Sequence, residues 1–348
     1  MKYDLRKIKD VEIANKIVLL RADLDVPVGD SKVADDTRLN AWFPTLEYLL
    51  SQKAKIIIAG HLGRPKGKDE KLTLKPVADW IAERFKINDL RLKNFGEFEG
   101  WEINENISIL QNLRFFKEEE KNDEDFSQKL ALLADVYVND AFASSHRAHS
   151  SIAGITKYLP SYAGLRLEKE VEELSKVLEN PKRPLAVIIG GAKIETKLPL
   201  VEEMHHFADY VLVGGEIAEN DKVLLKVQHE KIQGQKSALL VADLTSNLKD
   251  ITIKSSENFV QIIKNAATVV WNGPMGQVEN EKYQMGTEIL ATGISNLSTF
   301  TIVGGGDTLS FLKEKNLLDK FSFVSTGGGA MLEFLAGEKL PGLEILKI

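Results

Sequence analysis

Two hydrophobic periods alternate along the first half of the chain. Continuous apolar runs in Lys16–Val28 and Lys55–Gly60 predict buried strands, whereas apolar residues recur at helical spacing in Asp36–Ala54. Further strands are predicted at 107–113 and 135–140, and further helices at 73–85 and 123–134. Continuous apolar strands that alternate with amphipathic helices are typical of a parallel sheet covered on both faces. The pattern therefore predicts an α/β fold.

The second half repeats this scheme without repeating the sequence. Its predicted strands are Leu185–Gly190, Tyr210–Gly214, Thr268–Trp271, Phe300–Gly304 and Phe321–Ser325. Between the halves, an acidic helix with one apolar stripe (Leu167, Val171, Leu174, Val177 and Leu178) runs into the breaker sequence "NPKRP". At 348 residues, the chain is long enough for about two domains. We predict an N-terminal domain at 1–165, an interdomain helix at 166–181 and a C-terminal domain at 182–334. The alternative is an ordinary surface helix of a single domain.

Composition narrows the classes of function. The formal net charge is −6, so we expect no nucleic-acid partner, and any anion site has to be a local cluster of Lys and Arg. The chain has no cysteine, which excludes disulfides and thiolate chemistry. The charged N-terminus lacks the apolar segment of a signal peptide, and no apolar run is long enough to span a bilayer. These features favour a cytoplasmic enzyme without a membrane partner.

Arginine and histidine residues follow several predicted strands of the first half. Ligands bind beyond the carboxyl ends of parallel strands, so we expect these side chains to gather at one sheet edge. In chain order, the polar residues that follow the strands are Asp23, Asp25, Arg38, His61, Arg64, Arg114, His146, Arg147 and His149. Guanidinium groups repel one another unless an anion lies among them, and they bind carboxylate and phosphate bidentately. The cluster predicts a site for a small, multiply anionic molecule.

Two glycine triplets distinguish the second half. Gly304–Gly306 and Gly327–Gly329 each follow a predicted strand and begin a predicted helix. Backbone N–H groups at a helix N-terminus bind phosphate, and glycine lets the phosphate come close. Lys193 and Lys197 follow another strand, and Asp307 is placed to hold a magnesium ion that bridges phosphates. Neither a P-loop nor a G-x-G-x-x-G sequence after the first strand is present. The pattern favours a nucleoside di- or triphosphate site of another kind.

Eight motifs occur in order along nearly the whole chain: "DDTR", "HLGRP", "LQNLRF", "VNDAFASSHRAHSS", "GGAKIETK", "WNGPMG", "GGGDT" and "STGGGAMLEFLAGEKLPG". Together they resemble phosphoglycerate kinase. The resemblance implies two Rossmann-like three-layer domains whose mostly parallel sheets face across a hinged cleft, with the tail at about 335–348 returning to the N-terminal domain. It implies reversible phosphoryl transfer between 1,3-bisphosphoglycerate and ADP, giving 3-phosphoglycerate and ATP in glycolysis and gluconeogenesis. Mg²⁺ with ATP or ADP and a monomeric state are also implied.

The resemblance also assigns the site residues. The 3-phosphoglycerate site would comprise Asp23, Leu24, Asp25, Arg38, His61, Leu62, Gly63, Arg64, Arg114 and Arg147. The nucleotide site would comprise Lys193, Lys197, Glu279, Gly305, Gly306, Asp307 and Thr308, with Glu279 at the ribose and Asp307 at the magnesium ion. The catalytic roles would fall to Arg38, Lys193, Gly327 and Gly328. Alternatively, His61 and His149 are structural hydrogen-bond donors, and His146 only orients Arg147.

The chain departs from the family pattern in both halves. Asp25 stands where the family usually has Asn, and Glu216 replaces a glycine of the region that borders the adenine pocket. The segments that follow, near 221–237 and 245–250, are shorter than usual. These changes bear on the affinity for the acid substrate and on the preference for a nucleotide base. Two other hypotheses stay open: a kinase for a different acid, and a non-catalytic or altered-nucleotide relative with the same fold.

Overall fold

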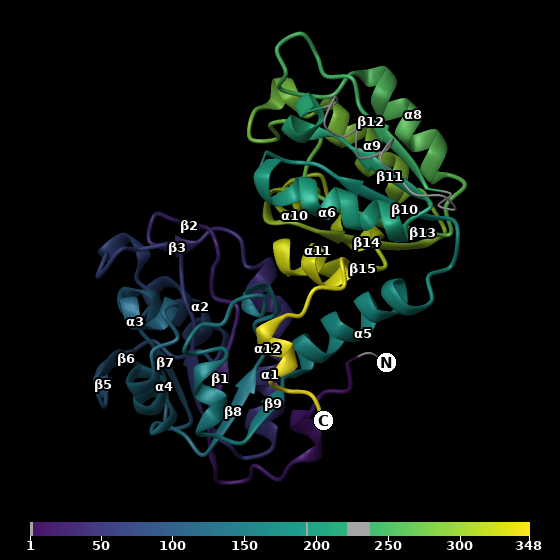
Figure 1. The fold of residues 1–348 in the computed structure, drawn as a ribbon. Helices are drawn as coiled ribbons and strands as arrows, with labels where there is room; N and C mark the ends of the chain where they lie inside the picture. Colours follow the sequence, from purple (N-terminus) through teal and green to yellow (C-terminus); the bar gives the residue numbers. More distant parts are fainter. Residues whose placement is uncertain (1–2, 193, 221–236) are drawn as a thin grey trace. The chain divides into compact units, whose positions relative to one another are not determined.

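The computed structural model describes residues 3–192, 194–220 and 237–348. The chain divides into two units (Figure 1). Unit 1 comprises the chain through Glu172 together with Lys339–Ile348. Unit 2 comprises Glu173–Glu338. Each unit is built around one sheet with helices packed on it, so the predicted α/β class is confirmed.

A seven-stranded sheet of order β5-β6-β7-β4-β1-β8-β9 forms the centre of unit 1. Its strands are β1 (Ile17–Arg21), β4 (Lys55–Ala59), β5 (Arg91–Phe95), β6 (Phe98–Glu102), β7 (Ile107–Leu110), β8 (Val136–Asn139) and β9 (Ser161–Ala163). The five neighbouring strands β7, β4, β1, β8 and β9 are parallel to one another, whereas β6 is antiparallel to both β5 and β7. The sequence analysis missed β5 and β6, because the exposed edge strand "RLKNF" lacks the apolar run of a buried strand.

Helices cover both faces of the unit 1 sheet. The helices are α1 (Thr37–Ser51), α2 (Lys75–Arg84), α3 (Lys117–Glu120), α4 (Glu124–Ala131) and α12 (Pro341–Glu344). Short elements are the 3-10 turns η1 (Ile8–Asp10), η2 (Glu70–Leu72), η3 (Leu113–Phe115), η4 (Phe142–Ser144) and η5 (Gly154–Lys157), and the hairpin β2 (Val28–Gly29) with β3 (Lys32–Val33). Alternate residues of β1 serve two cores: Val18 and Leu20 pack with α1 and α2, whereas Leu19 packs with α4. The buried strand β1 thus has a helix layer on each side.

The C-terminal residues return to unit 1. The backbone N–H of Arg6 donates to the carbonyl oxygen of Leu346 at 2.8 Å, and the N–H of Gly342 donates to the carbonyl oxygen of Ser145 at 2.8 Å. Asn139, at the end of β8, adds a side-chain hydrogen bond to the carbonyl oxygen of Gly342 at 3.3 Å. The tail is therefore fixed beside the loop that follows β8.

Unit 2 contains a six-stranded, fully parallel sheet of order β12-β11-β10-β13-β14-β15. Its strands are β10 (Leu185–Ile189), β11 (Tyr210–Val213), β12 (Ala238–Val241), β13 (Thr268–Asn272), β14 (Phe300–Gly304) and β15 (Phe323–Ser325). Its helices are α6 (Ile194–Phe207), α8 (Ile253–Ile263), α9 (Met285–Ser295), α10 (Gly306–Glu314) and α11 (Gly329–Leu335), with the turns η6 (Gly215–Asn220), η7 (Glu281–Tyr283) and η8 (Leu318–Lys320). The five strands predicted for this half are present, and β12 is an addition.

One apolar core fixes three helices of unit 2 on its sheet. Phe259 of α8, Leu290 of α9 and Leu309 of α10 pack in a cluster with Ile188 of β10 and Trp271 of β13. Helix α6 packs on β10 and β11 and against α11. The triplets before α10 and α11 are therefore held by helices that are themselves anchored on the sheet.

Helix α5 (Leu165–Glu179) spans the residues at which the chain passes from unit 1 to unit 2. Its predicted apolar stripe is buried at Leu167, Val171, Leu174 and Val177. At its first turn, the backbone N–H of Leu167 donates to Asp140 Oδ1 at 2.9 Å, which compensates an N–H group that has no partner within the helix. Among the described residues, no helix combines the length and apolarity needed to cross a bilayer.

Candidate active site

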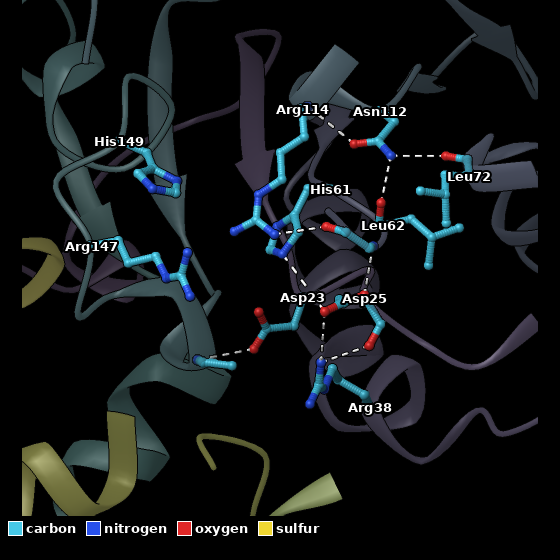
Figure 2. Close-up of polar contacts among 12 residues, drawn as sticks. Asp23, Asp25, Arg38, His61, Leu62, Leu72, Asn112, Arg114, Arg147 and His149 are labelled. Atoms are coloured by element: carbon cyan, nitrogen blue, oxygen red, sulfur yellow. Dashed lines mark hydrogen bonds and ion pairs between the residues drawn. The ribbon is translucent and has the colours of Figure 1, made fainter. Parts of the chain in front are cut away.

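Four strands of unit 1 bring polar side chains to the same sheet edge. β1 pairs with β4 and β8, and β4 pairs with β7, so the carboxyl ends of these strands are neighbours. Figure 2 shows the side chains of Asp23, Asp25, His61, Arg114 and Arg147 gathered around one region beyond these ends. The structure thus brings together the residues that the sequence distributes over more than 120 positions.

Two carboxylates lie among the cationic groups. Asp23 is 3% exposed, and its Oδ2 accepts a hydrogen bond from the N–H of Ala143 at 3.2 Å. Its Oδ1 has no hydrogen-bond partner among the described residues, and burial raises the pKa of this carboxyl. Asp25 is more open, and its Oδ1 accepts from the N–H of Gly63 at 2.8 Å. Asp23 Oδ1 is therefore an acceptor that a ligand hydroxyl can use.

Arg38 lies in the first turn of α1. The turn is fixed by Asp35 Oδ1, which accepts from the N–H and the Oγ1 of Thr37 at 3.0 and 2.7 Å. Arg38 Nη1 donates to the carbonyl oxygen of Asp25 at 2.6 Å and lies 3.9 Å from Asp25 Oδ2. Because a guanidinium group has five N–H donors, these contacts leave donors for an external anion.

His61 lies between Arg21 and Asp25. Arg21 Nη2 donates to His61 Nδ1 at 2.9 Å, and His61 Nε2 lies 3.8 Å from Asp25 Oδ2. The imidazole is 5% exposed; burial, and after it the charge of Arg21, hold the pKa of His61 well below its ordinary value. His61 is therefore neutral at physiological pH and presents Nε2 to the site.

Two side chains hold the loop after β4. Asn112 Nδ2 donates to the carbonyl oxygen of Leu62 at 2.7 Å, and Arg114 Nη1 donates to the carbonyl oxygen of Gly63 at 2.7 Å (Figure 2). Gly63 has φ +63°, a left-handed conformation that favours glycine. Burial, and after it the charge of Arg147, lower the pKa of Arg114 to about 10. The cations of the site are thus held close to one another against their repulsion.

Arg147 is held by a neighbouring histidine. Arg147 Nε donates to His146 Nε2 at 3.0 Å, which supports the orienting role that the sequence left open for His146. Burial lowers the pKa of His146 to about 4 and the pKa of His149 to about 3. Both imidazoles are neutral at physiological pH, so the positive charge of the site comes from its arginines.

Three of the expected site residues stand apart from this polar cluster. The side chains of Leu24 and Leu62 are buried in the apolar core of unit 1, so only their backbone groups can serve a ligand. Arg64 is exposed on the loop after β4.

The glycine triplets of unit 2 follow the paired strands β14 and β15. Gly305, with φ +98°, precedes α10, and Gly328, with φ +51°, precedes α11, so each triplet begins a helix as predicted. Asn272, at the end of β13, connects them. Its Nδ2 donates to the carbonyl oxygen of Gly328 at 3.0 Å, and its Oδ1 lies 3.4 Å from where a Cβ of Gly305 would stand.

The glycines of unit 2 are of two kinds. A Cβ at Gly190 would lie 2.3 Å from the carbonyl oxygen of Pro274, so packing alone requires glycine there. A Cβ at Gly306, Gly328 or Gly329 would meet no atom within 4 Å. Gly327, in contrast, is buried. The open glycines leave their backbone accessible, as the approach of a phosphate requires.

The two lysines and the glutamate assigned to the nucleotide differ in position. Lys197 Nζ donates to the carbonyl oxygen of Gly190, which places its charge beside the end of β10. Lys193 lies outside the described residues. Glu279 is exposed on the loop between β13 and η7, and no hydrogen bond or ion pair within the described part of the chain joins it to the triplets.

Asp307 is exposed in the first turn of α10. The adjacent Thr308 is buried, and its Oγ1 has no hydrogen-bond partner among the described residues. In the same part of the chain, no group of three or more His, Asp or Glu side chains forms a metal site. Mg²⁺ is commonly held by one or two carboxylates together with substrate phosphates. Asp307 and Thr308 therefore fit an ion that arrives with phosphate groups.

Sequence reasoning missed several residues that build the site. Arg21 ends β1 and is fully buried, and its signal was a single cation in an otherwise apolar strand. Asn112 is the residue before the turn η3, and Asn272 ends β13. Each holds neighbouring backbone through its side-chain amide. Such roles depend on contacts between distant segments, which spacing along the chain does not reveal.

Comparison with known families places these features in context. The family model described as phosphoglycerate kinase matches residues 8–239 and 220–338. The chain is 38% identical to the phosphoglycerate kinase of Pseudothermotoga lettingae over 387 aligned positions, which cover 97% of each protein. It is also 38% identical to that of Dictyoglomus turgidum over 395 positions, covering 99% of each. Both alignments are longer than the 348 residues of this chain, so the relatives carry residues that it lacks.

Solved structures give the same picture. The phosphoglycerate kinase of Coxiella burnetii is 32% identical and superposes with a TM-score of 0.78, covering 99% of both chains. That of Pyrococcus horikoshii is 30% identical with a TM-score of 0.81, covering 98% of both chains.

Proposed function

The chain belongs to the phosphoglycerate kinase family, and from that premise we propose how its own residues carry out the reaction. The enzyme is a kinase of glycolysis that transfers a phosphoryl group reversibly between 1,3-bisphosphoglycerate and ADP, giving 3-phosphoglycerate and ATP. The observation that carries the assignment of residues is the cationic cluster around Asp23 in unit 1.

In this proposal, unit 1 binds 3-phosphoglycerate. Arg38, Arg114 and Arg147 supply charged donors to its carboxylate and phosphate, and Arg64 joins them from its exposed loop. Asp23 Oδ1, which has no other hydrogen-bond partner within the described residues, accepts from the substrate hydroxyl. Burial and, after it, the charge of Arg147 lower the pKa of Arg114, and an anion among these cations would offset the second of these causes. The backbones of Leu24, Leu62 and Gly63 and the side chains of Asp25 and His61 line the same site.

Unit 2 binds the nucleotide. Lys197 and the N–H groups of Gly305 and Gly306 contact the phosphates, and Glu279 contacts the ribose. Asp307, beside Thr308, would hold Mg²⁺ together with those phosphates, and the ion when bound compensates their negative charge. The glycines with open space next to them support this assignment, because a phosphate can approach the backbone there.

The chemistry of transfer needs no general base. The attacking carboxylate of 3-phosphoglycerate is already ionised at neutral pH, so catalysis rests on alignment and on neutralising charge. Arg38 from unit 1 and Lys193 from unit 2 take the charge role. The helix start at Gly327 and Gly328 stabilises the transferring phosphoryl group, with the N–H of Gly328 as the direct donor. The N–H of Gly327 donates to Ser325 Oγ at 3.1 Å, which holds the start of the turn in place.

Two further features belong to this proposal. Because the two substrates are assigned to different units, transfer requires motion that brings them together, and α5 is the natural hinge. Exclusion of water during transfer protects the acyl phosphate from hydrolysis. We assign the enzyme to the cytoplasm as a monomer.

A coupled assay with 3-phosphoglycerate and MgATP tests the function. We expect turnover that depends on Mg²⁺ and on both substrates. Comparison of ATP with GTP tests the base site, which contains Glu216 and shortened segments. Absence of turnover together with absence of nucleotide binding by calorimetry would contradict the proposal and favour a non-catalytic relative.

A further inference from the structure

Arg21 is the one fully buried arginine among the described residues, and each of its three nitrogens donates to a named acceptor. Nε donates to Ser151 Oγ at 2.9 Å and Nη1 donates to the carbonyl oxygen of Ala22 at 2.6 Å. Nη2 donates to His61 Nδ1 at 2.9 Å. A buried charge with three directed hydrogen bonds is rigid, so the position of its partner atoms is fixed with it.

In the contact between Arg21 and His61, only one of the two groups can be the donor. A guanidinium group contains donors and no acceptor, and it stays protonated in proteins. His61 Nδ1 must therefore accept, which leaves the single ring proton of the neutral imidazole on Nε2. Nε2 is the atom that lies 3.8 Å from Asp25 Oδ2 and faces the proposed acid site.

A second charge holds Arg21 in place. Glu119 is fully buried, and its Oε1 accepts from Ser151 Oγ at 2.5 Å while its Oε2 accepts from the N–H of Ser151 at 2.9 Å. The carbonyl oxygen of Ser151 accepts from the hydroxyl of Tyr137 at 2.7 Å. Glu119, Ser151, Arg21 and His61 thus form a continuous chain of hydrogen bonds from the interior of unit 1 to its site.

We propose that Arg21 is a positioning residue for phosphoryl transfer: through Nη2 it fixes His61 in the tautomer that donates from Nε2 to the anionic substrate. This inference rests on the proposed function, because it takes His61 to contact the substrate acid. It separates two roles that the sequence could not separate, since the same imidazole is a structural acceptor on one side and a substrate donor on the other.

The arrangement also makes this donor independent of pH over the range in which histidine usually titrates, about pH 5 to 8. The charged groups around His61 are Arg21 from β1, Arg38 from α1 and Arg114 from η3, with the neutral imidazole of His149. Asp25 is the carboxylate nearest to it. The cations outnumber the carboxylate, so protonation of His61 is unfavourable and the Nε2 proton remains in place without a second proton on Nδ1.

The tautomer is measured directly on the ring nitrogens of ¹⁵N-labelled wild-type protein by NMR. We expect His61 Nδ1 to give the signal of an unprotonated nitrogen and Nε2 that of a protonated one, without change between about pH 5 and 8. A proton on Nδ1 would overturn the proposal. This measurement needs neither substrate nor turnover, so its outcome is independent of whether the proposed function holds.

Variants then test the consequence for the substrate. Arg21→Met with Glu119→Gln removes the donor while keeping the buried charges balanced, and Glu119→Gln alone is the matched control that retains Arg21. We expect KM for 3-phosphoglycerate in the double variant to exceed that of the control roughly tenfold at about pH 8, the scale of one hydrogen bond to a charged group.

The ratio of the two KM values should hold between about pH 6 and 8, because burial and the charges of Arg114 and Arg38 still oppose protonation of His61 when Arg21 is removed. The substrate's own ionisation affects both proteins alike and cancels in this ratio. kcat should change less than KM, and Arg21→Lys, which keeps a charged donor, should restore part of the affinity. A ratio near one at every pH would overturn the proposal. If the double variant fails to fold, the ring-nitrogen measurement on the wild type still decides it.

Discussion

The two units offer a ligand different surfaces at the carboxyl ends of their sheets. In unit 1 the site is made of side chains, and Arg38, His61, Arg114 and Arg147 each have a hydrogen-bond partner that fixes their direction. In unit 2 it is made largely of backbone, with helices that begin at Gly306 and Gly329 in open space. Under the proposed function, unit 1 would therefore recognise the shape and charge of one small acid, whereas unit 2 would recognise phosphate groups.

The difference extends to the electrostatic state of each edge. The arginines of unit 1 lie close to one another: burial first, and then the charge of Arg147, lower the pKa of Arg114 to about 10. At the carboxyl edge of the unit 2 sheet, positive potential arises from backbone dipoles at the triplets and from Lys197, whose ammonium group donates to the carbonyl oxygen of Gly190 at the end of β10. Substitutions in unit 1 should accordingly alter activity by changing charge. Substitutions at the triplets of unit 2 should alter it by filling the space next to the backbone.

The largest effect is expected at Arg38. Arg38→Ala removes a charge assigned to the transferring group, so kcat should fall by roughly 10²- to 10⁴-fold, the scale of losing an electrostatic stabiliser. Steady-state kinetics with both substrates varied measures it. Arg91→Ala, on the exposed strand β5, is the matched control and should leave kcat unchanged. Near-normal turnover in Arg38→Ala would contradict the proposal that Arg38 neutralises charge on the transferring group.

The next effect separates backbone recognition from packing in unit 2. Gly306→Ala and Gly329→Ala add a methyl group where no atom lies within 4 Å, and neither residue has a positive φ. Folding should be unharmed or favoured by about 0.4–1 kcal/mol, because alanine restricts the unfolded chain. The methyl group would nevertheless keep phosphate from the backbone, so nucleotide KM should rise in Gly306→Ala and kcat should fall in Gly329→Ala, each by roughly 10- to 100-fold.

Thermal unfolding and kinetics on the same samples distinguish these causes. Gly29→Ala, also with open space around its Cβ position but on the β2–β3 hairpin of unit 1, serves as the control. Loss of stability in parallel with activity would mean that the triplets are structural turns.

This contrast explains what the sequence could reveal. The apolar strands and the ordered motifs predicted both sheets and the family, because buried parallel strands leave a strong continuous signal. The edge strand β5 was missed because its residues are polar and exposed. β12 was also missed, although it is apolar and as long as β11. Arg38 and Arg114 were found because they follow strands, whereas Arg21 was not, because it lies within one. Its role depends on Ser151, 130 positions away.

A smaller effect, of opposite sign, is expected at Asp25. Its carboxylate lies 3.9 Å from Arg38 Nη1 and 3.8 Å from His61 Nε2, so it competes with the substrate for these donors. Asp25→Asn keeps an oxygen that can accept from the N–H of Gly63 and removes the negative charge. KM for 3-phosphoglycerate should fall by up to roughly tenfold.

Kinetic titration with 3-phosphoglycerate checks this, together with inhibition by sulfate, which should strengthen in the same variant. The matched control is Asp89→Asn, which removes the same charge from an exposed position of unit 1. A raised KM in Asp25→Asn would instead mean that the carboxylate itself binds the substrate.

The smallest effect concerns acid stability, which should distinguish the units. Burial lowers the pKa of His149 from 6.5 to about 3, so below pH 6.5 the unfolded chain binds a proton that the folded chain excludes. The free energy of unfolding therefore decreases as pH falls from 6.5 toward 3, and the contribution is complete only above 6.5. His149→Gln removes this titration, so its melting temperature should fall less than that of the wild type between about pH 6.5 and 4, by roughly 2–4 °C for each kcal/mol. Hydrogen exchange of β1 and β4, compared with β13 and β14, assigns the change to a unit. If the melting temperatures of the two proteins fall equally with pH, burial of the His149 imidazole does not lower the stability of unit 1 in acid.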